Sequence, residues 1–319
     1  MKTPSLRWAS AAALALLVVA AALRHPGAVS ARVALDLLAD NAVLGIAALG
    51  ATLVIVSGGI DLSIGASMAL ASTVVAVLLE KHGLSPAPAF GLALALGALF
   101  GAAMGALIHF LALPPFLVTL AGMFLARGIA LRLHVESLAI AHPSYERLTA
   151  AGIRFAPGVT LTLGAMLFVL ALALSSWLLR QTRLGRDVYA VGGNAEAALL
   201  AGVNVARTRI AVYALGGAAS ALAGIAYTLY GSAGSSTAGS GLELEAIAAV
   251  VLGGARISGG VGGALGTLLG VLVLGVIQLA LIFEGAPGAG WTRVAIGALL
   301  LAFLALQRAF DSRAPALRG

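Results

Sequence analysis

The sequence predicts an all-α integral membrane protein, a polytopic helical bundle of about ten transmembrane helices with one broken or re-entrant helix and an internal repeat. Of the 319 residues, 61% are hydrophobic and only 10% are charged, whereas a soluble domain carries about 25% charged residues. The chain holds 41 glycines, close to double the usual share of about 7%, and such residues favour close packing of helices in lipid. We therefore expect one transmembrane domain over residues 1–319.

Nine apolar runs are long enough to cross the hydrocarbon core, which is about 30 Å thick. They cover residues 9–23, 41–57, 62–79, 89–112, 115–132, 159–179, 209–230, 261–283 and 292–308. A tenth segment at residues 246–258 is shorter and contains Gly253, Gly254 and Arg256. We expect this segment to cross the membrane as the broken or re-entrant helix.

The charges between the runs predict that both termini are cytoplasmic. With ten crossings, eleven basic residues fall inside and seven outside, which agrees with the positive-inside tendency. The formal charge of +7 then reflects cytoplasmic arginines, and no nucleic-acid partner is expected. The first run also fits a cleaved signal peptide, but no soluble secreted domain follows it, so we expect this run to be retained.

Two connections are long enough to have a function of their own, an outer loop at residues 134–158 and an inner loop at residues 180–209. In the inner loop, Asn194 is a good N-cap, Glu196 suits the first turn and Gly202 supplies a left-handed stop. So short a helix is not stable alone in water. It must dock on its own protein or on a partner.

Residues 57–65, "SGGIDLSIG", align without gaps to residues 252–260, "LGGARISGG". Duplication and chance similarity between glycine-rich segments both account for the match, and repeats are typical of transporter folds. The alignment places Asp61 opposite Arg256. We expect Asp61 or Ser63 to cap the helix that runs toward Glu80, with a role of Asp61 in transport, for example as a pair with Arg256 near an inner gate, as the alternative. The gate or hinge candidates are Gly58, Gly59, Asp61, Ser63, Gly253, Gly254, Arg256 and Ser258.

Two stripes have the spacing GxxxGxxxG, which exposes bare backbone on one helix face. Their members are Gly97, Gly101 and Gly105, and Gly262, Gly266 and Gly270. A contact between helices of one subunit is favoured over a dimer seam.

Several kinds of chemistry are not expected. The chain has no cysteine and its five histidines lie far apart, so we expect no metal site and no cofactor. The only lysines, Lys2 and Lys81, do not stand in a phosphate loop, so energy from ATP would have to come from another chain. Asp61 has no second aspartate of the kind that an intramembrane protease needs. We therefore expect no enzyme; a secondary sugar facilitator is the runner-up to an ATP-driven permease.

Four stretches resemble the permease subunits of bacterial monosaccharide ABC importers, the ribose, xylose and galactose group. They are "VSGGIDLSIGASMALAS", "LPPFLVTLAGMFLARGIAL", "TRLGRDVYAVGGNAEAALLAGVN" and "LEAIAAVVLGGARISGGVGGALGTLLGVLVLGVIQ". The resemblance runs in order from about residue 41 to residue 308. "ESLAIAHPSYERL", "GRDVYAVGGNA" and "WTRVAIGALLLAFLALQR" resemble most the galactofuranose-type permeases.

The resemblance implies an assembly in the bacterial inner membrane. A second, related permease chain would complete the pathway as a heterodimer, a periplasmic sugar-binding protein would deliver the sugar, and a separate ATP-binding subunit would drive the cycle. Residues 231–241, with Glu243 and Glu245, are either a contact for the binding protein or a flexible outer loop. The short inner helix resembles the coupling helix that contacts the ATPase. Its residues are Asn194, Ala195, Glu196, Ala197, Ala198, Leu199, Leu200, Ala201 and Gly202.

A pathway for a neutral sugar needs weak hydrogen-bonding groups and aromatic edges that release the substrate. The polar and aromatic candidates within or at the predicted spans are Asn41, Ser67, Phe116, Thr119, Tyr227 and Gln278. For each of these residues, ordinary packing or a hydrogen bond between helices is the alternative role.

Overall fold

The computed structural model describes residues 4–24, 30–156 and 159–283, together with the single positions 290, 291, 294, 297, 298 and 301. The helices are α1 Pro4–Arg24, α2 Ala31–Asp40, α3 Ala42–Val56, α4 Ile64–Glu80, α5 Pro86–Phe110, α6 Pro115–Leu133, α7 Pro143–Thr149, α8 Leu163–Gln181, α9 Arg183–Gly193, α10 Ala195–Leu200, α11 Val205–Gly231, α12 Leu242–Leu252 and α13 Ala264–Phe283. The strands are β1 Leu138–Ala139, β2 Gly152–Ala156, β3 Val159–Thr162 and β4 Ala233–Gly234. The expected span at residues 292–308 lies largely outside the described residues.

In the described part of the chain, five helices are long and apolar enough to cross a membrane, namely α5, α6, α8, α11 and α13. The pair α2 and α3, bent by 59° at the break between them, would make a sixth span. Eight of the nine predicted apolar runs each coincide largely with one helix. The helical, polytopic architecture is confirmed, and the number of ten crossings stays a prediction.

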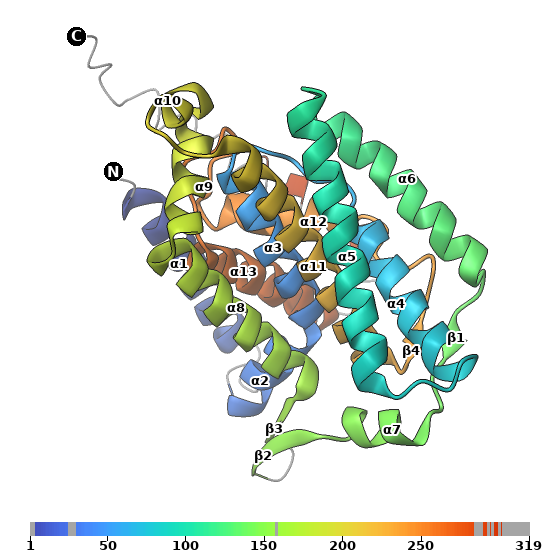
Figure 1. Ribbon diagram of the computed structural model, residues 1–319. Helices are drawn as coiled ribbons and strands as arrows, with labels where there is room; N and C mark the ends of the chain where they lie inside the picture. Colours follow the sequence, from blue (N-terminus) through green and yellow to red (C-terminus); the bar gives the residue numbers. More distant parts are fainter. Residues whose placement is uncertain are drawn as a thin grey trace.

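Helix α11 lies at the centre of the bundle and packs against α3, α4 and α5 (Figure 1). Helices α3 and α4 are buried along almost their whole length, whereas α5, α6 and α8 each keep a face of large exposed apolar side chains, such as Leu99, Phe124 and Leu174. In a membrane protein such faces suit contact with lipid or with another membrane helix. The buried helices are thus flanked by helices whose outer faces suit the hydrocarbon core.

Both glycine stripes pack within the subunit, as expected. A Cβ at Gly97 would fall against the Gly217 carbonyl of α11, and a Cβ at Gly101 would overlap the Tyr213 carbonyl. In the second stripe, Gly266 and Gly270 lie against the backbone of α12. The missing side chains let these helix axes approach closely, which is the usual use of small residues between membrane helices.

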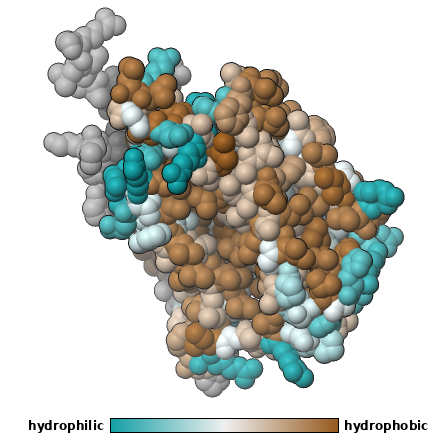
Figure 2. Space-filling view, in the orientation of Figure 1, coloured by the Kyte–Doolittle hydropathy of each residue, from teal (hydrophilic) through white to brown (hydrophobic). Residues whose placement is uncertain are grey.

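The bundle has two polar ends, and we name them by the helices that they carry. Helices α9 and α10 lie at one end, the α10 end, and α7 with the strand pair β2–β3 lies at the other, the α7 end (Figure 1). Figure 2 shows hydrophobic residues over the middle of this face and hydrophilic residues gathered toward the ends. The ends therefore suit the two aqueous sides of a membrane, and the belt between them suits its hydrocarbon core.

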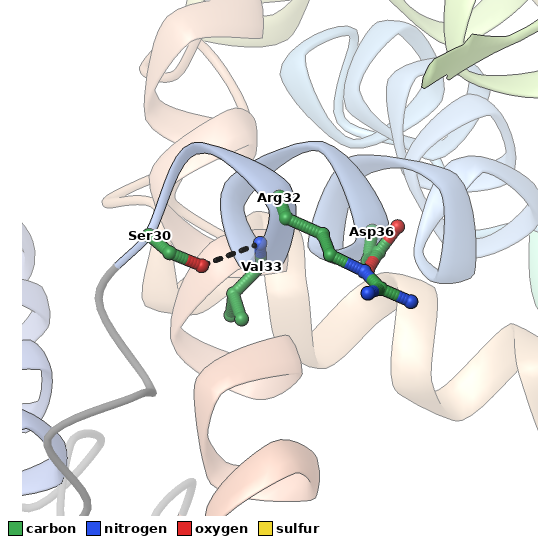
Figure 3. A network of polar contacts seen from close by, with 4 residues as sticks. All are labelled: Ser30, Arg32, Val33 and Asp36. Atoms are coloured by element: carbon green, nitrogen blue, oxygen red, sulfur yellow. Dashed lines mark hydrogen bonds and ion pairs between the residues drawn. The ribbon is translucent and has the colours of Figure 1, made fainter. Parts of the chain in front are cut away.

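Helix α2 lies at the α7 end and carries charged side chains on one face. Ser30 caps the helix by accepting a hydrogen bond from the Val33 amide at 3.2 Å. One turn apart on α2, Arg32 and Asp36 lie side by side, with Nε 3.6 Å from Oδ2 (Figure 3). Both side chains are mostly exposed. This face of α2 therefore points to water, while Leu38 packs against the core.

Candidate functional site

Helix α3 ends in a turn that requires glycine. The amide of Gly58 donates to the Ile55 carbonyl and the amide of Gly59 donates to the Val54 carbonyl, both at 2.9 Å. Gly58 has a φ of +84°, a left-handed conformation that costs other residues steric strain. This pair of hydrogen bonds around a left-handed glycine is a Schellman turn, a common way to end a helix.

Helix α12 ends in the same turn. The amide of Gly254 donates to the Val251 carbonyl at 2.8 Å, and the amide of Ala255 donates to the Val250 carbonyl at 3.2 Å. Gly254 has a φ of +87°. The similarity seen in the sequence is thus a similarity of backbone structure.

The structural register differs by one residue from the gap-free sequence alignment. The left-handed residues Gly58 and Gly254 are equivalent, whereas the alignment matched Gly58 with Gly253. In the structural register, Asp61 corresponds to Ile257 and not to Arg256. The sequence alignment matched the two Gly-Gly pairs letter by letter. In the structure, the equivalent residues are those with a positive φ, which is the first glycine of one pair and the second glycine of the other.

Asp61 lies in the turn between α3 and α4 and is buried, with 3% of its surface exposed. Its Oδ1 atom accepts two hydrogen bonds from Ser63, from the amide and from the hydroxyl, each at 2.7 Å. Ser63 is the N-cap residue of α4 but makes no side-chain capping bond to the helix. Asp61 therefore orders the turn that leads into α4. The expectation that Asp61 or Ser63 caps this helix is wrong, because neither side chain bonds an amide of α4. The pairing of Asp61 with Arg256 stays a prediction.

The same turn is tied to two other helices. The Leu62 amide donates to Thr119 Oγ1 of α6 at 3.1 Å, and the Tyr213 hydroxyl of α11 donates to the Ile60 carbonyl at 3.3 Å. Because of these hydrogen bonds, a movement of α6 or α11 would also move the turn.

A cavity of about 300 Å³ opens beside this turn at the α10 end. Gly58 and Gly59 line one wall, Pro114 of the connection between α5 and α6 lines another, and Arg209 and Tyr213 of α11 complete it. Arg209 and Tyr213 are four residues apart and so lie on one helix face. Sequence reasoning missed both residues, although this spacing was a signal that could have found them.

The six pathway candidates are not gathered at this cavity. The Asn41 side-chain amide donates to the Leu37 carbonyl at 2.9 Å, at the bend between α2 and α3. Thr119 makes the contact with Leu62 described above, Ser67 is buried in α4, and Phe116 is about half exposed on α6. Tyr227 and Gln278 are half-buried on α11 and α13. Their role in a pathway stays a prediction.

The short helix expected in the inner loop is present as α10, and its caps are confirmed. The Asn194 side chain accepts a hydrogen bond from the Ala197 amide at 2.9 Å, and Gly202 has a φ of +82°. Ala198 is buried, but Leu199 and Leu200 are 62% and 89% exposed. A helix at a polar end that presents two neighbouring leucines to solvent has the character of a contact surface.

Arg127 of α6 has a role that the sequence did not reveal. Its Nη1 atom donates to the carbonyls of Ser236 and Ala238, both at 2.7 Å. These carbonyls belong to the non-helical segment at residues 232–241, which runs along α4 from Ser72, beside Gly234, to Gly65, beside Gly239. Irregular backbone that is buried inside a protein needs hydrogen-bond partners, and the guanidinium supplies two of them.

This segment bears on two expectations. Residues 231–241 were expected to be a contact for the binding protein or a flexible outer loop; burial of Ser235 and Ser236 disfavours a flexible loop, and the contact stays a prediction. The tenth predicted crossing, residues 246–258, overlaps the half-length helix α12 at Leu242–Leu252, which is preceded by the segment at residues 232–241 and followed by the Schellman turn. The predicted break in this helix is confirmed, and its crossing of the membrane stays a prediction. The helix is broken on both sides, because glycines occur before it at Gly239 and Gly241 as well as after it.

Comparison with known proteins identifies relatives over most of the chain. A family model described as "Branched-chain amino acid transport system / permease component" matches residues 33–304. The inner membrane ABC transporter permease protein YjfF of Escherichia coli (strain K12) is 46% identical over 285 residues, which cover 89% of this chain and 86% of that protein. No solved structure matches.

Two further relatives are named for the sugars that they import. The fructose import permease protein FruG of Bifidobacterium longum is 36% identical over 86% of this chain and 82% of its own length. The ribose import permease protein RbsC of Bacillus subtilis is 38% identical over 83% of this chain and 81% of its own length.

Proposed function

Because the chain belongs to the family described as the permease component of the branched-chain amino acid transport system, we propose that it is the membrane subunit of an ATP-driven monosaccharide importer. Relatives that cover more than four fifths of the chain are import permeases for ribose and fructose, which supports a sugar as the substrate. The observation that carries the proposal is the exposed pair Leu199 and Leu200 on α10.

In this proposal α10 is the coupling helix, and the α10 end faces the cytoplasm together with both chain termini. A helix of six residues is too short to be stable by itself. It is held by its N-cap and by Ala198, which leaves Glu196, Leu199 and Leu200 for the ATP-binding subunit. Closure of that subunit on ATP would then move α10 relative to the bundle.

The α7 end faces the periplasm in this arrangement and receives the sugar-binding protein. A second, related permease chain completes the pathway as a heterodimer in the inner membrane. The "ESLAIAHPSYERL" stretch, which includes α7, and the "GRDVYAVGGNA" stretch of α9 and α10 resemble galactofuranose-type permeases, so we propose galactofuranose as the sugar.

The test uses the complete complex, with the ATP-binding subunit, the second permease and the binding protein, reconstituted in proteoliposomes. Uptake of labelled galactofuranose, galactose, ribose and fructose is measured with and without ATP. We expect ATP-dependent uptake with galactofuranose as the best substrate. Uptake that persists without ATP, or without an ATP-binding chain, would instead establish a secondary facilitator.

Leu200→Asp tests the coupling surface. It places a charge at the centre of the proposed contact, so co-purification of the ATP-binding subunit and ATP-driven uptake should fall at least about tenfold, as for the central residues of other interfaces. The matched control is Ile153→Asp on β2, an exposed apolar residue at the opposite end, which should leave the ATP-binding subunit attached. Equal attachment in both variants would remove α10 from this interface.

A further inference from the structure

Backbone from three separate segments meets close to the start of α10, at a place that we call the glycine joint. It consists of Gly58 after α3, Gly192 in the last turn of α9, and Gly259 and Gly260 between α12 and α13. The amide of Gly260 donates to the carbonyl of Val56, the last residue of α3, at 2.9 Å. The two equivalent helix-ending turns are therefore joined to each other directly by their backbones.

Gly192 closes over this hydrogen bond. A Cβ atom built on Gly192 would overlap the Val56 carbonyl oxygen and would lie 2.7 Å from the Gly260 nitrogen, so it would push against both atoms of the bond. Gly259, with a φ of +90°, fits equally closely, since its Cβ would lie 2.7 Å from the Gly192 carbonyl and 2.8 Å from the Gly58 Cα. Contacts of this kind cannot absorb a displacement by a change of rotamer.

The joint is continuous with α10. Val191 of α9, Ala198 of α10 and Val205 of α11 form one buried cluster, so a force on α10 reaches the last turn of α9. One turn earlier on α9, the Tyr189 hydroxyl donates to the Gly262 carbonyl at 2.9 Å. Helix α9 therefore holds the connection between α12 and α13 at two points.

We propose that Gly192 is the positioning residue through which movement of α10 reaches the ends of α3 and α12 together. This inference rests on the proposed role of α10 as the coupling helix. Close-packed backbone transmits a displacement because it has no room to deform. Gly58 and Gly59, which follow α3, also line the cavity at the α10 end, so the same movement changes the wall of that cavity.

Two neighbouring glycines give a matched test. Gly192 and Gly193 are the last two residues of α9, so replacing either with alanine makes the same change in helix propensity. A Cβ on Gly193 would meet no atom within 4 Å. In the reconstituted complex, Gly192→Ala should lower the sugar transported per ATP hydrolysed by about tenfold, with the ATP-binding subunit still attached. Gly193→Ala should preserve the ratio.

An unchanged ratio in Gly192→Ala, or an equal loss in Gly193→Ala, overturns the proposal. Failure of the proposed function would show differently, because the unmodified complex itself would then transport without ATP. Tyr189→Phe provides a variant that adds no volume, and it should lower the same ratio by weakening the hold of α9 on Gly262.

A distance measurement covers the case in which Gly192→Ala does not assemble. The chain has no cysteine, so spin labels can be placed on introduced cysteines at the exposed positions Ala190, Ile257 and Lys81. Between the nucleotide-free and ATP-trapped complexes, the Ala190–Ile257 distance should stay constant while the Ala190–Lys81 distance changes. The proposal is contradicted if the Ala190–Ile257 distance changes, or if the Ala190–Lys81 distance stays constant.

Discussion

The two ends of the bundle are held together in different ways. At the α10 end, backbone lies directly on backbone, as where Gly253 meets Gly266 and where Gly192 meets Val56. At the α7 end, helix α7 is held by side chains: the Tyr145 ring packs edge-on against Phe90 with centroids 6.3 Å apart.

The difference matters for how each end responds to change. Side chains can adopt other rotamers, whereas a backbone contact is lost as soon as one carbon atom is added. The contacts at Gly192 and Gly253 should therefore be sensitive to a single added methyl group, whereas the packing of α7 should respond mainly to ionisation of Tyr145.

The largest effect is expected from Gly253→Ala. The added Cβ would overlap the Gly266 carbonyl and lie 2.7 Å from the Thr267 nitrogen. Neither backbone atom can move without separating α12 from α13, so the free energy of unfolding should fall by about 3 kcal/mol, at the upper end for overpacking. Thermal unfolding of the purified protein in detergent measures this loss.

The control for this variant is Gly128→Ala on α6, where a Cβ would meet no atom within 4 Å. Alanine is the better helix former, so stability should be unchanged or slightly increased. Equal destabilisation of the two variants would show that backbone contact does not explain the sensitivity of the α10 end.

A smaller effect is expected at Asp61. Asp61→Ala removes the acceptor of two hydrogen bonds and leaves the buried amide and hydroxyl of Ser63 without it, at a cost of about 2 kcal/mol. Asp61→Asn keeps the Oδ1 acceptor and should retain most of the stability and the sugar uptake. Unfolding temperature and uptake are measured on both variants.

The result also separates the two roles considered for this carboxylate. If Asp61→Asn loses uptake as completely as Asp61→Ala, the charge itself is needed, and the exchange of Asp61→Arg with Arg256→Asp then tests a pair. Restored uptake in the exchange would support the pair, although the structural register places Ile257 opposite Asp61.

The smallest effect is expected at the α7 end and depends on pH. Tyr145 of α7 is fully buried, and burial raises the pKa of its phenol to about 12, compared with about 10 in the unfolded chain. Above pH 10 the unfolded form loses the proton more readily than the folded form, so the stabilisation present below pH 10 is lost as the pH approaches 12. The loss at pH 11 is about 1 kcal/mol.

Hydrogen exchange of the α7 amides, corrected for the intrinsic pH dependence of exchange, follows this loss. Tyr145→Phe has no proton to release and should show a shallower decline in protection between pH 10 and pH 12. A decline as steep as in the unmodified protein would assign the pH dependence to other groups.

Local features of the fold could be predicted from the sequence more reliably than distant contacts. The caps of α10 follow from Asn194 and Gly202, whose partners are within a few residues. The glycine stripes were correctly assigned to contacts within the subunit, because bare backbone on one helix face needs a neighbouring helix. In the repeat, identical letters misled the alignment by one residue, since a Gly-Gly pair does not show which glycine has the positive φ.

The contacts that organise the candidate site were beyond the sequence for a physical reason. Gly192 and Arg127 each contact backbone carbonyl groups of residues that are far away in the sequence. Every residue type has such a carbonyl. No residue pattern marks such a partner. The strands β1 and β4 have two residues each, which is too short for an alternating pattern that would predict a strand.

The hydrogen bonds of Arg127 also bear on how the protein is made. Its acceptor carbonyls lie 109 and 111 residues later in the chain, which corresponds to about 5–20 s of bacterial synthesis. Until those residues emerge from the ribosome, α6 carries a guanidinium without its final acceptors, and such a charge is costly in lipid. We therefore expect α6 to reach its final packing only after the chain has been translated past Ala238.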